Sequence, residues 1–254
     1  MTNRSMLLAG AFSVFFLAFL AASTPLGFFM RAAGLIDAGL AFDRAEGTIW
    51  RGALIGAQWR ERPLGDVRLA VRPLSLAVGR VDLDFEFDGD GVYGRGALSA
   101  SVFGRVALKD AEIRADLTRF EFNEPEPLAV TGAFSAEISR LVFSRRGCVA
   151  ADVAAWTDIL AQSARALNYS GPPLEARGYC EDGGIVLPFI GRDEDEEVAL
   201  TLTFDRHYRY RLYSEVRTDD ARLDAVLPQF GFRGGAGVYE YERTGRVGFA
   251  QPVS

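Results

Sequence analysis

Apolar and acidic residues alternate strictly between Val81 and Asp88. Because successive side chains of a β-strand point to opposite faces, this order places Leu83, Phe85 and Phe87 on one face and four carboxylates on the other. One apolar face and one hydrated face are typical of a strand in an antiparallel sheet. Similar alternation marks residues 197–204 and 207–216, so the pattern predicts strands in both halves of the chain.

Most of the remaining chain also predicts strands, which are separated by turn sequences rich in glycine and aspartate. The further predicted strands are 47–54, 57–60, 67–72, 91–101, 105–109, 112–118, 132–143, 148–156, 174–180 and 185–190, and a final hairpin covers 238–249 with its turn at Thr244–Gly245. Short helices are expected at 73–78, 157–167 and 219–230. So few helices argue against alternating βαβ units. We therefore expect a mostly β protein, with a curved antiparallel sheet or open barrel-like groove.

A change in composition divides the predicted sheet near residues 123–127, where the sequence reads Asn-Glu-Pro-Glu-Pro. The blocks on either side both open with a glycine, run through paired strands and then reach a helical turn. This parallel order predicts two related halves, 40–123 and 128–254, that arose by duplication.

Residues 6–30 form an uninterrupted uncharged run of leucine, phenylalanine, alanine and other small residues. About 20 apolar residues are enough to cross a bilayer as a helix, so we expect a single transmembrane anchor here. Arg4 precedes the run, which favours a cytoplasmic N-terminus at residues 1–5 and a periplasmic body at residues 31–254. The alternative is a signal peptide cleaved near Leu20–Ser23.

The charge and the counts of metal-binding residues exclude several function classes. The formal net charge is −6, whereas a nucleic-acid-binding protein normally carries a basic excess. With one histidine and two cysteines, the chain cannot supply a four-ligand structural zinc site of the usual kind. In an oxidising compartment Cys148 and Cys180 are expected to form a disulfide, and the alternative is a pair of buried free thiols.

Three motifs that could carry chemistry have simpler explanations. Residues 89–94 match G-x-G-x-x-G, but a strand rather than a helix is predicted after them, so a hairpin turn is favoured over a dinucleotide site. Glu86, Asp88 and Asp90 resemble half of a calcium-binding loop that lacks its final glutamate. His207 has no nucleophile placed beside it and is expected at the surface, at the end of a strand. We expect no catalytic residue, no metal and no cofactor.

One set of motifs is more specific. The sequence reads Glu-Gly-Thr-Ile-Trp-Arg-Gly-Ala at 46–53 and Arg-Pro-Leu-Ser-Leu at 72–76. At the end of the last predicted helix it reads Leu-Pro-Gln-Phe-Gly-Phe, residues 227–232. In this order and spacing the chain resembles the type II secretion system protein N (GspN) family. The matching signature residues are Gly47, Thr48, Trp50, Gly52, Pro73, Leu74, Trp156 and Gly231. We interpret them as packing residues: Gly47 and Gly52 would bracket a short strand, and Trp50 and Trp156 would be anchors in the core.

The resemblance implies an accessory or assembly component of the type II secretion machinery in the inner membrane. Such a protein would bind other secretion subunits in the periplasm, with no nucleic acid and no small-molecule substrate. The alternative is a membrane-tethered periplasmic protein that binds lipid or maintains the envelope, with a β groove similar to that of AsmA-like proteins. A periplasmic hydrolase is a third alternative, although no motif supports it.

Overall fold

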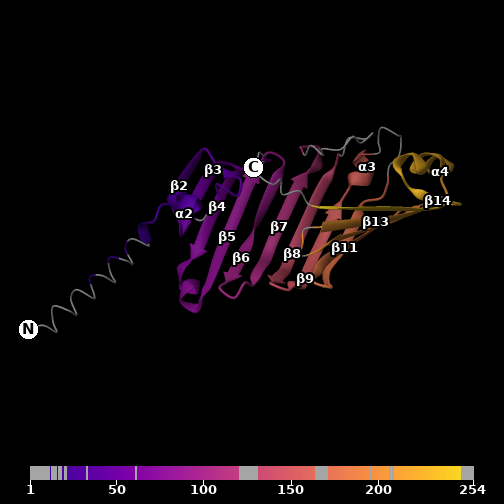
Figure 1. Cartoon of the computed structure of the whole chain (residues 1–254). Helices are drawn as coiled ribbons and strands as arrows, with labels where there is room; N and C mark the ends of the chain where they lie inside the picture. Colours follow the sequence, from indigo (N-terminus) through magenta and orange to yellow (C-terminus); the bar gives the residue numbers. More distant parts are fainter. Residues whose placement is uncertain are drawn as a thin grey trace, which may run out of the picture. The chain divides into compact units, whose positions relative to one another are not determined.

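A computed structural model of the chain describes residues 12, 16, 19, 22–32, 34–60, 62–119, 131–163, 171–194, 196–205, 207 and 209–246. They fall into two compact units, with the division between Tyr93 and Gly94. Each unit contains antiparallel strands and only short helices (Figure 1), so the predicted mostly β class is confirmed. The predicted break at 123–127 lies outside the described residues, and the duplication stays a prediction.

Unit 1, residues 1–93, contains a small sheet with one helix packed against it. Its elements are α2 (Leu26–Ala32), β1 (Leu40–Ala41), β2 (Arg44–Thr48), β3 (Arg51–Trp59), β4 (Arg62–Arg72), the 3-10 helix η1 (Pro73–Val78) and β5 (Arg80–Gly89). The strands follow the order β1-β3-β4-β5, and β2 pairs with β3. From β2 to β5, sequential strands are therefore neighbours, as the short predicted turns require, whereas β1 pairs with β3 rather than with β2.

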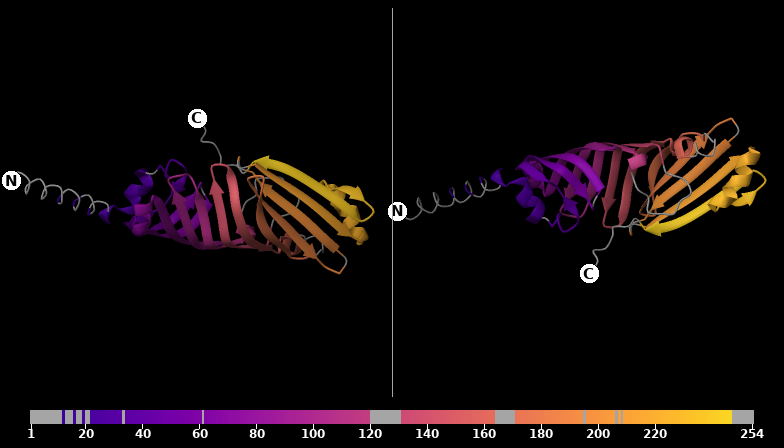
Figure 2. Two further views of the ribbon diagram at one scale, coloured as in Figure 1. Left: turned by 90° about the horizontal axis from the view of Figure 1, so that it is seen from below. Right: turned by 90° about the horizontal axis from the view of Figure 1, so that it is seen from above.

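Unit 2, residues 94–254, is also an antiparallel meander and contains nearly all of β6. Its elements are β6 (Val92–Ser101), β7 (Val106–Asp116), η2 (Leu117–Arg119), β8 (Ala133–Ser144), β9 (Gly147–Thr157), α3 (Ile159–Ser163), β10 (Leu174–Glu181), β11 (Gly184–Arg192), β12 (Glu196–Phe204), β13 (Arg209–Thr218), α4 (Ala221–Val226), η4 (Leu227–Phe230), β14 (Arg233–Gly235) and β15 (Val238–Arg246). Neighbouring strands follow chain order until β13, which is followed by β15 and then β14. Within this unit the sheet twists, so that β11, β13 and β15 lie at an angle to β7–β9 (Figure 2).

The strand register explains why each sheet has one apolar face. In unit 1, Leu69 pairs with Phe85 and Val71 with Leu83, so these side chains share a face. The opposite face carries charged pairs, among them Arg68 with Glu86, whose closest N–O distance is 3.6 Å, and Arg72 with Asp84 at 2.8 Å. Exposed pairs of this kind add little stability, so burial of the apolar face provides most of the stabilisation.

The core of unit 2 is made of aliphatic and aromatic side chains from its central and C-terminal strands. Its buried members are Ala136, Ala155, Leu174, Ala176, Phe189, Val198, Val216 and Tyr239. Leu227 and Phe232, which flank the η4 turn, pack against this cluster from outside the strands. The buried Tyr239 hydroxyl donates to Asp224 Oδ1 at 2.6 Å, so α4 is tied to the sheet by a polar contact as well.

A disulfide joins Cys148 of β9 to Cys180 of β10, with their Cα atoms 5.6 Å apart. The predicted pairing is therefore present, and the alternative of two free thiols is wrong. The bridge closes a segment of 32 residues that includes α3. By the loop-closure argument, a constraint of this length on the unfolded chain is worth about 3–4 kcal/mol.

Several predicted boundaries were wrong. The predicted strands 105–109 and 112–118 form the single strand β7, in which Asp110 has a left-handed φ of 46°. No turn occurs at Thr244–Gly245, because β15 runs through both residues in register with β13. The hairpin instead lies earlier in the sequence, between β14 and β15, and its turn residues Ala236 and Gly237 both have positive φ.

The N-terminal apolar run is described only in part. Most of residues 6–25 lies outside the described residues, but α2 packs on unit 1, where Leu26 is 2% exposed and Met30 is 6% exposed. The chain before α2 also joins the sheet, because the Ile49 N–H donates to the Thr24 carbonyl at 3.2 Å. Among the residues that the structure describes, none of the helices combines the length and the apolar character needed to span a bilayer.

Candidate functional site

The first signature motif is a tight β-hairpin rather than one strand. Gly47 pairs with Gly52 and Thr48 with Arg51 across β2 and β3, which leaves Ile49 and Trp50 as the two turn residues. The prediction that the two glycines bracket a strand was therefore wrong. They face each other across the ladder, and the turn presents Trp50 at its tip.

Both glycines are required by close backbone approach. Gly47 has a φ of +78°, and a Cβ there would lie 2.5 Å from the Arg51 carbonyl oxygen. A Cβ at Gly52 would lie 2.6 Å from the Glu46 carbonyl oxygen and 2.8 Å from Leu26 Cδ2. The hairpin can therefore form, and α2 can pack on it, only if neither position has a side chain.

The hairpin tip meets the second signature motif. The Val71 N–H donates to the Trp50 carbonyl at 3.0 Å, which joins the tip to the end of β4 immediately before Pro73. Trp50, Pro73 and Leu74 then line one shallow depression of about 580 Å³. Two motifs that are separated in the sequence by residues 54–71 thus form one surface feature in unit 1.

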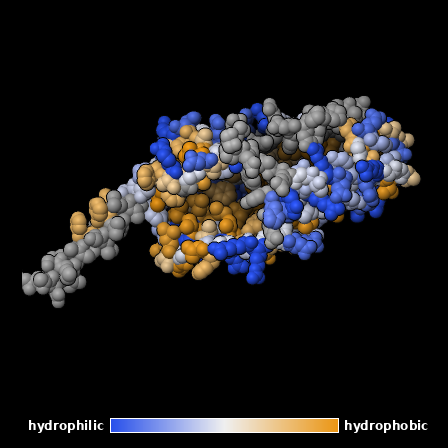
Figure 3. Space-filling view, viewed as in Figure 1, coloured by the Kyte–Doolittle hydropathy of each residue, from blue (hydrophilic) through white to orange (hydrophobic). Residues whose placement is uncertain are grey.

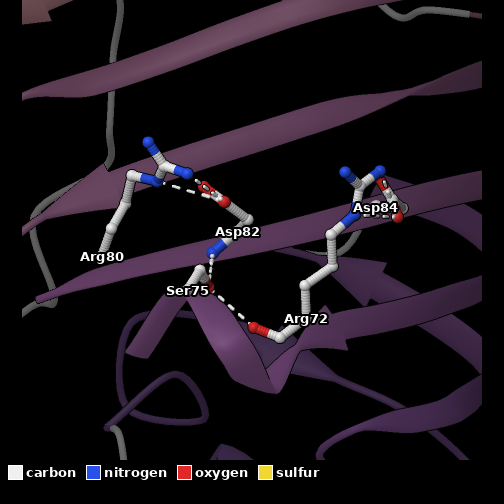
Figure 4. Close-up of polar contacts among 5 residues, drawn as sticks. All are labelled: Arg72, Ser75, Arg80, Asp82 and Asp84. Carbon is white, nitrogen blue, oxygen red and sulfur yellow. Dashed lines mark hydrogen bonds and ion pairs between the residues drawn. The ribbon is translucent and has the colours of Figure 1, made fainter. Parts of the chain in front are cut away.

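The second motif is a rigid 3-10 turn held by a buried serine (Figure 4). Ser75 is 7% exposed, and its hydroxyl donates to the Arg72 carbonyl at 2.7 Å. The same oxygen accepts the Asp82 N–H at 3.0 Å, so one side chain connects the end of β4 to the start of β5. Pro73 fixes the first residue of the turn, and Gly79 ends it with a φ of 68°.

The apolar side chains of this turn point into solvent. Leu74 is 87% exposed, Val78 is 71% exposed and Leu76 is 45% exposed. The arginines at its ends are neutralised, because Arg72 pairs with Asp84 at 2.8 Å and Arg80 pairs with Asp82 at 2.9 Å. These residues, 72–84, form what we call the η1 surface: an apolar projection whose flanking charges are satisfied within the chain.

The sequence reasoning singled out Pro73 and Leu74 but missed Val78, Arg80 and the acceptor carboxylates of Asp82 and Asp84. The available signal was the hydrophobic spacing within 73–78, where every second residue is polar or small. In a 3-10 turn this spacing cannot tell which side chains face the sheet. The structure buries the serine and exposes the leucines, which is the reverse of the usual preference.

The remaining signature residues belong to unit 2. Trp156 is half-buried and pairs with Ser135 and Glu175 in neighbouring strands, on the face opposite the core residue Ala155. The expectation that Trp156 anchors the core was therefore wrong, since it lines a surface depression together with Glu175, Arg177 and several apolar residues. Trp50 is likewise half-buried, at the turn described above.

Gly231 ends the η4 turn in the left-handed region, with a φ of 85°, and its N–H donates to the Pro228 carbonyl at 3.1 Å. The turn directs Phe232 back to the core of unit 2, where its ring lies 5.2 Å from that of Tyr241. Gly231 therefore ends a turn that positions Phe232 in unit 2.

The motifs that could have carried catalysis or metal binding have structural roles here. Residues 89–94 span the turn from β5 into β6, and no helix follows them. His207 is exposed in the turn between β12 and β13, and its backbone N–H donates to Asp205 Oδ1 at 2.7 Å. The Arg209 backbone N–H donates to the same carboxylate and, with the Arg209 guanidinium, lowers the pKa of Asp205 to about 2. Asp205 thus stabilises the turn as an anion.

A family model described as "Type II secretion system (T2SS), protein N" matches residues 38–242 of the chain. The match includes both signature motifs, the disulfide and nearly all of the strands described above. No curated protein and no solved structure matches the chain significantly.

Replacement of Gly52 by alanine should destabilise unit 1, because the new Cβ would collide with two backbone carbonyls and with Leu26. We expect the free energy of unfolding to fall by roughly 1–3 kcal/mol, as for other overpacked sites, measured by urea denaturation. Gly235→Ala is the matched control, since nothing lies within 4 Å of a Cβ at that position. Equal stability of the two variants would contradict the close packing of α2 on the hairpin.

Proposed function

Since the chain belongs to the type II secretion system protein N family, we propose that it is an inner-membrane accessory or assembly component of the type II secretion machinery. In this proposal it acts by binding other secretion subunits in the periplasm and catalyses no reaction. Membership of the family supports a role in type II secretion. The structural observation that supports binding of another secretion subunit is the η1 surface.

The η1 surface has the properties of a protein-binding site rather than of an incompletely packed core. Leu74 and Val78 project from a turn that Ser75 and Pro73 hold rigid, so little conformational entropy would be lost when they are buried by a partner. Exposed apolar side chains with a polar rim are typical of interaction sites. The rim here consists of arginine–aspartate pairs, which can remain paired at the edge of an interface.

The membrane location rests on the sequence. The uncharged run at 6–30 is long enough for one span, and Arg4 favours a cytoplasmic N-terminus. We propose that this run anchors the chain in the inner membrane, although its last residues, from Thr24 on, pack on unit 1, and that residues 31–254 lie in the periplasm. The disulfide supports this location, because such bonds persist in oxidising compartments.

A second candidate function is lipid binding, which one observation favours. The apolar face of β4 and β5 carries Leu69, Leu83, Phe85 and Phe87, and all four side chains are only half-buried. Hydrophobic residues gather over these strands in a hollow on the side that Figure 3 shows. An acyl chain could lie on such a face, as expected of a lipid-handling protein tethered to the membrane.

The subunit contact is tested by affinity purification of the full chain from a strain that carries the secretion machinery. Leu74→Asp combined with Val78→Asp should lower the recovery of other secretion subunits at least roughly tenfold, because two buried apolar contacts become buried charges. Val238→Asp is the matched control, since Val238 is 43% exposed but lies in unit 2. Unchanged recovery with the double variant would exclude the η1 surface as the contact.

The location is tested by a reporter fused after Ser254. With a reporter that is active only in the periplasm, we expect the fusion to show activity. In the same protein, Cys148 and Cys180 should resist alkylation until a reductant is added. A cytoplasmic reporter signal, or thiols that react without reduction, would contradict the proposed orientation.

The lipid alternative is separated from the first proposal by mass spectrometry of the purified full chain. If the face of β4 and β5 binds lipid, Phe85→Asp should remove most of the co-purified phospholipid while recovery of secretion subunits stays unchanged. Phe85 is half-buried and its ring stacks on Phe87 at 6.2 Å, so the variant's fold is checked by its unfolding curve. Equal lipid content in both proteins would rule out this function for the face.

A further inference from the structure

Two neighbouring turns of unit 2 lie at the same end of its sheet. One connects β6 to β7 through residues 102–105, and the other connects β8 to β9 through residues 145–146. Val106, the first residue of β7, pairs with Phe143 near the end of β8, so the two turns extend from one sheet edge. We call residues 102–105 with 145–146 the arginine–phenylalanine tip.

The first turn is apolar and fully accessible. Phe103 is 83% exposed and Val102 is 71% exposed, and just behind them Val106 is 40% exposed and Phe143 is 37% exposed. Exposure of an aromatic ring at the end of a turn is unfavourable in water and marks a surface that contacts something else.

The tip is also basic, and its charges are not neutralised. Arg105, Arg145 and Arg146 are exposed, and within the described part of the chain none of them forms an ion pair. By contrast, Arg95 and Arg114 in the adjoining strands both pair with Glu112. Three uncompensated cations on a chain of net charge −6 point to an anionic partner.

The two turns are in contact and are held in place. A Cβ at Gly104 would lie 2.9 Å from Arg145 Nε, so the Arg145 side chain lies against the backbone of the apolar turn. The Ser101 hydroxyl accepts the Arg105 N–H at 3.2 Å, and the Ser144 hydroxyl accepts the Arg146 N–H at 3.1 Å. Each turn is therefore fixed by a serine that binds the backbone of an arginine.

Acidic residues are also present beside the tip. Glu181 and Asp182 lie in the next turn, which is joined to β9 because the Cys148 N–H donates to the Gly183 carbonyl at 2.8 Å. Both are exposed and neither pairs with an arginine of the tip within the described residues. They reduce the local positive potential but leave the arginines available for a ligand.

We propose that the arginine–phenylalanine tip binds the surface of a bilayer that contains anionic phospholipid. Val102 and Phe103 enter the boundary between headgroups and acyl chains, while the arginines bind lipid phosphates through charge-assisted hydrogen bonds. A protein partner would be expected where charges are already paired, as on the η1 surface, whereas free cations around an apolar projection suit an anionic membrane. The inference is independent of the proposed secretion role.

The test uses the full chain held in nanodiscs of neutral phosphatidylcholine, to which separate vesicles are added. We expect flotation to recover the protein with vesicles that contain phosphatidylglycerol but not with vesicles of phosphatidylcholine alone. Arg145→Ser and Arg146→Ser should each lower recovery roughly fivefold, the value for one cation near an anionic surface. Val102→Ser with Phe103→Ser should lower it further, and Val238→Ser, at an exposed position of β15, should leave it unchanged.

Phe103→Trp provides a second measurement that keeps the tip apolar. We expect this variant to retain vesicle recovery, and its additional tryptophan emission to shift to shorter wavelength when anionic vesicles are added. Equal recovery with neutral and anionic vesicles, or recovery that the tip substitutions do not change, would overturn the proposal. So would loss of a secretion subunit from the tip variants with vesicle recovery intact, which would assign the tip to a protein partner.

Discussion

The alternation of side chains along antiparallel strands is the constraint on which the rest of the structure depends. Once neighbouring strands are paired in register, Leu69 and Phe85 must share one face while Arg72 and Asp84 share the other. The first face excludes water where a helix covers it, as α2 covers Leu54 of β3. The backbone N–H and C=O groups of the strands are hydrogen-bonded to neighbouring strands. Surfaces that could bind a partner can therefore arise only at turns and at sheet faces that nothing covers.

The surface features that distinguish this chain therefore lie at its turns. At both surfaces to which we assign a contact, serine hydroxyls bond to nearby backbone: Ser75 within the η1 surface, and Ser101 and Ser144 at the base of the arginine–phenylalanine tip. The two differ in charge balance, because the arginines beside Ser75 have carboxylate partners. This difference leads us to assign a protein partner to one turn and an anionic membrane to the other.

The sequence predicted the strands well because their signal, a period of two, is local and repeated. It also predicted the disulfide, which required only a compartment and a count of cysteines. The strand signal does not show where a short segment turns: Gly47 and Gly52 are predicted at the ends of one strand, but they pair with each other across a hairpin. The position of Trp156 on the face opposite the core was also missed, because its neighbours on that face come from other strands.

The packing of α2 limits where the chain can be truncated to remove the N-terminal apolar run. Leu26 and Met30 are buried against Leu54 and Ala57, and Thr24 is hydrogen-bonded to the first hairpin. A soluble fragment that starts at Arg31, the boundary suggested by hydropathy, would therefore leave an apolar hole in unit 1. A fragment designed for crystallisation has to begin before Thr24 and must keep Phe28 and Phe29, which hydropathy alone would assign to the lipid.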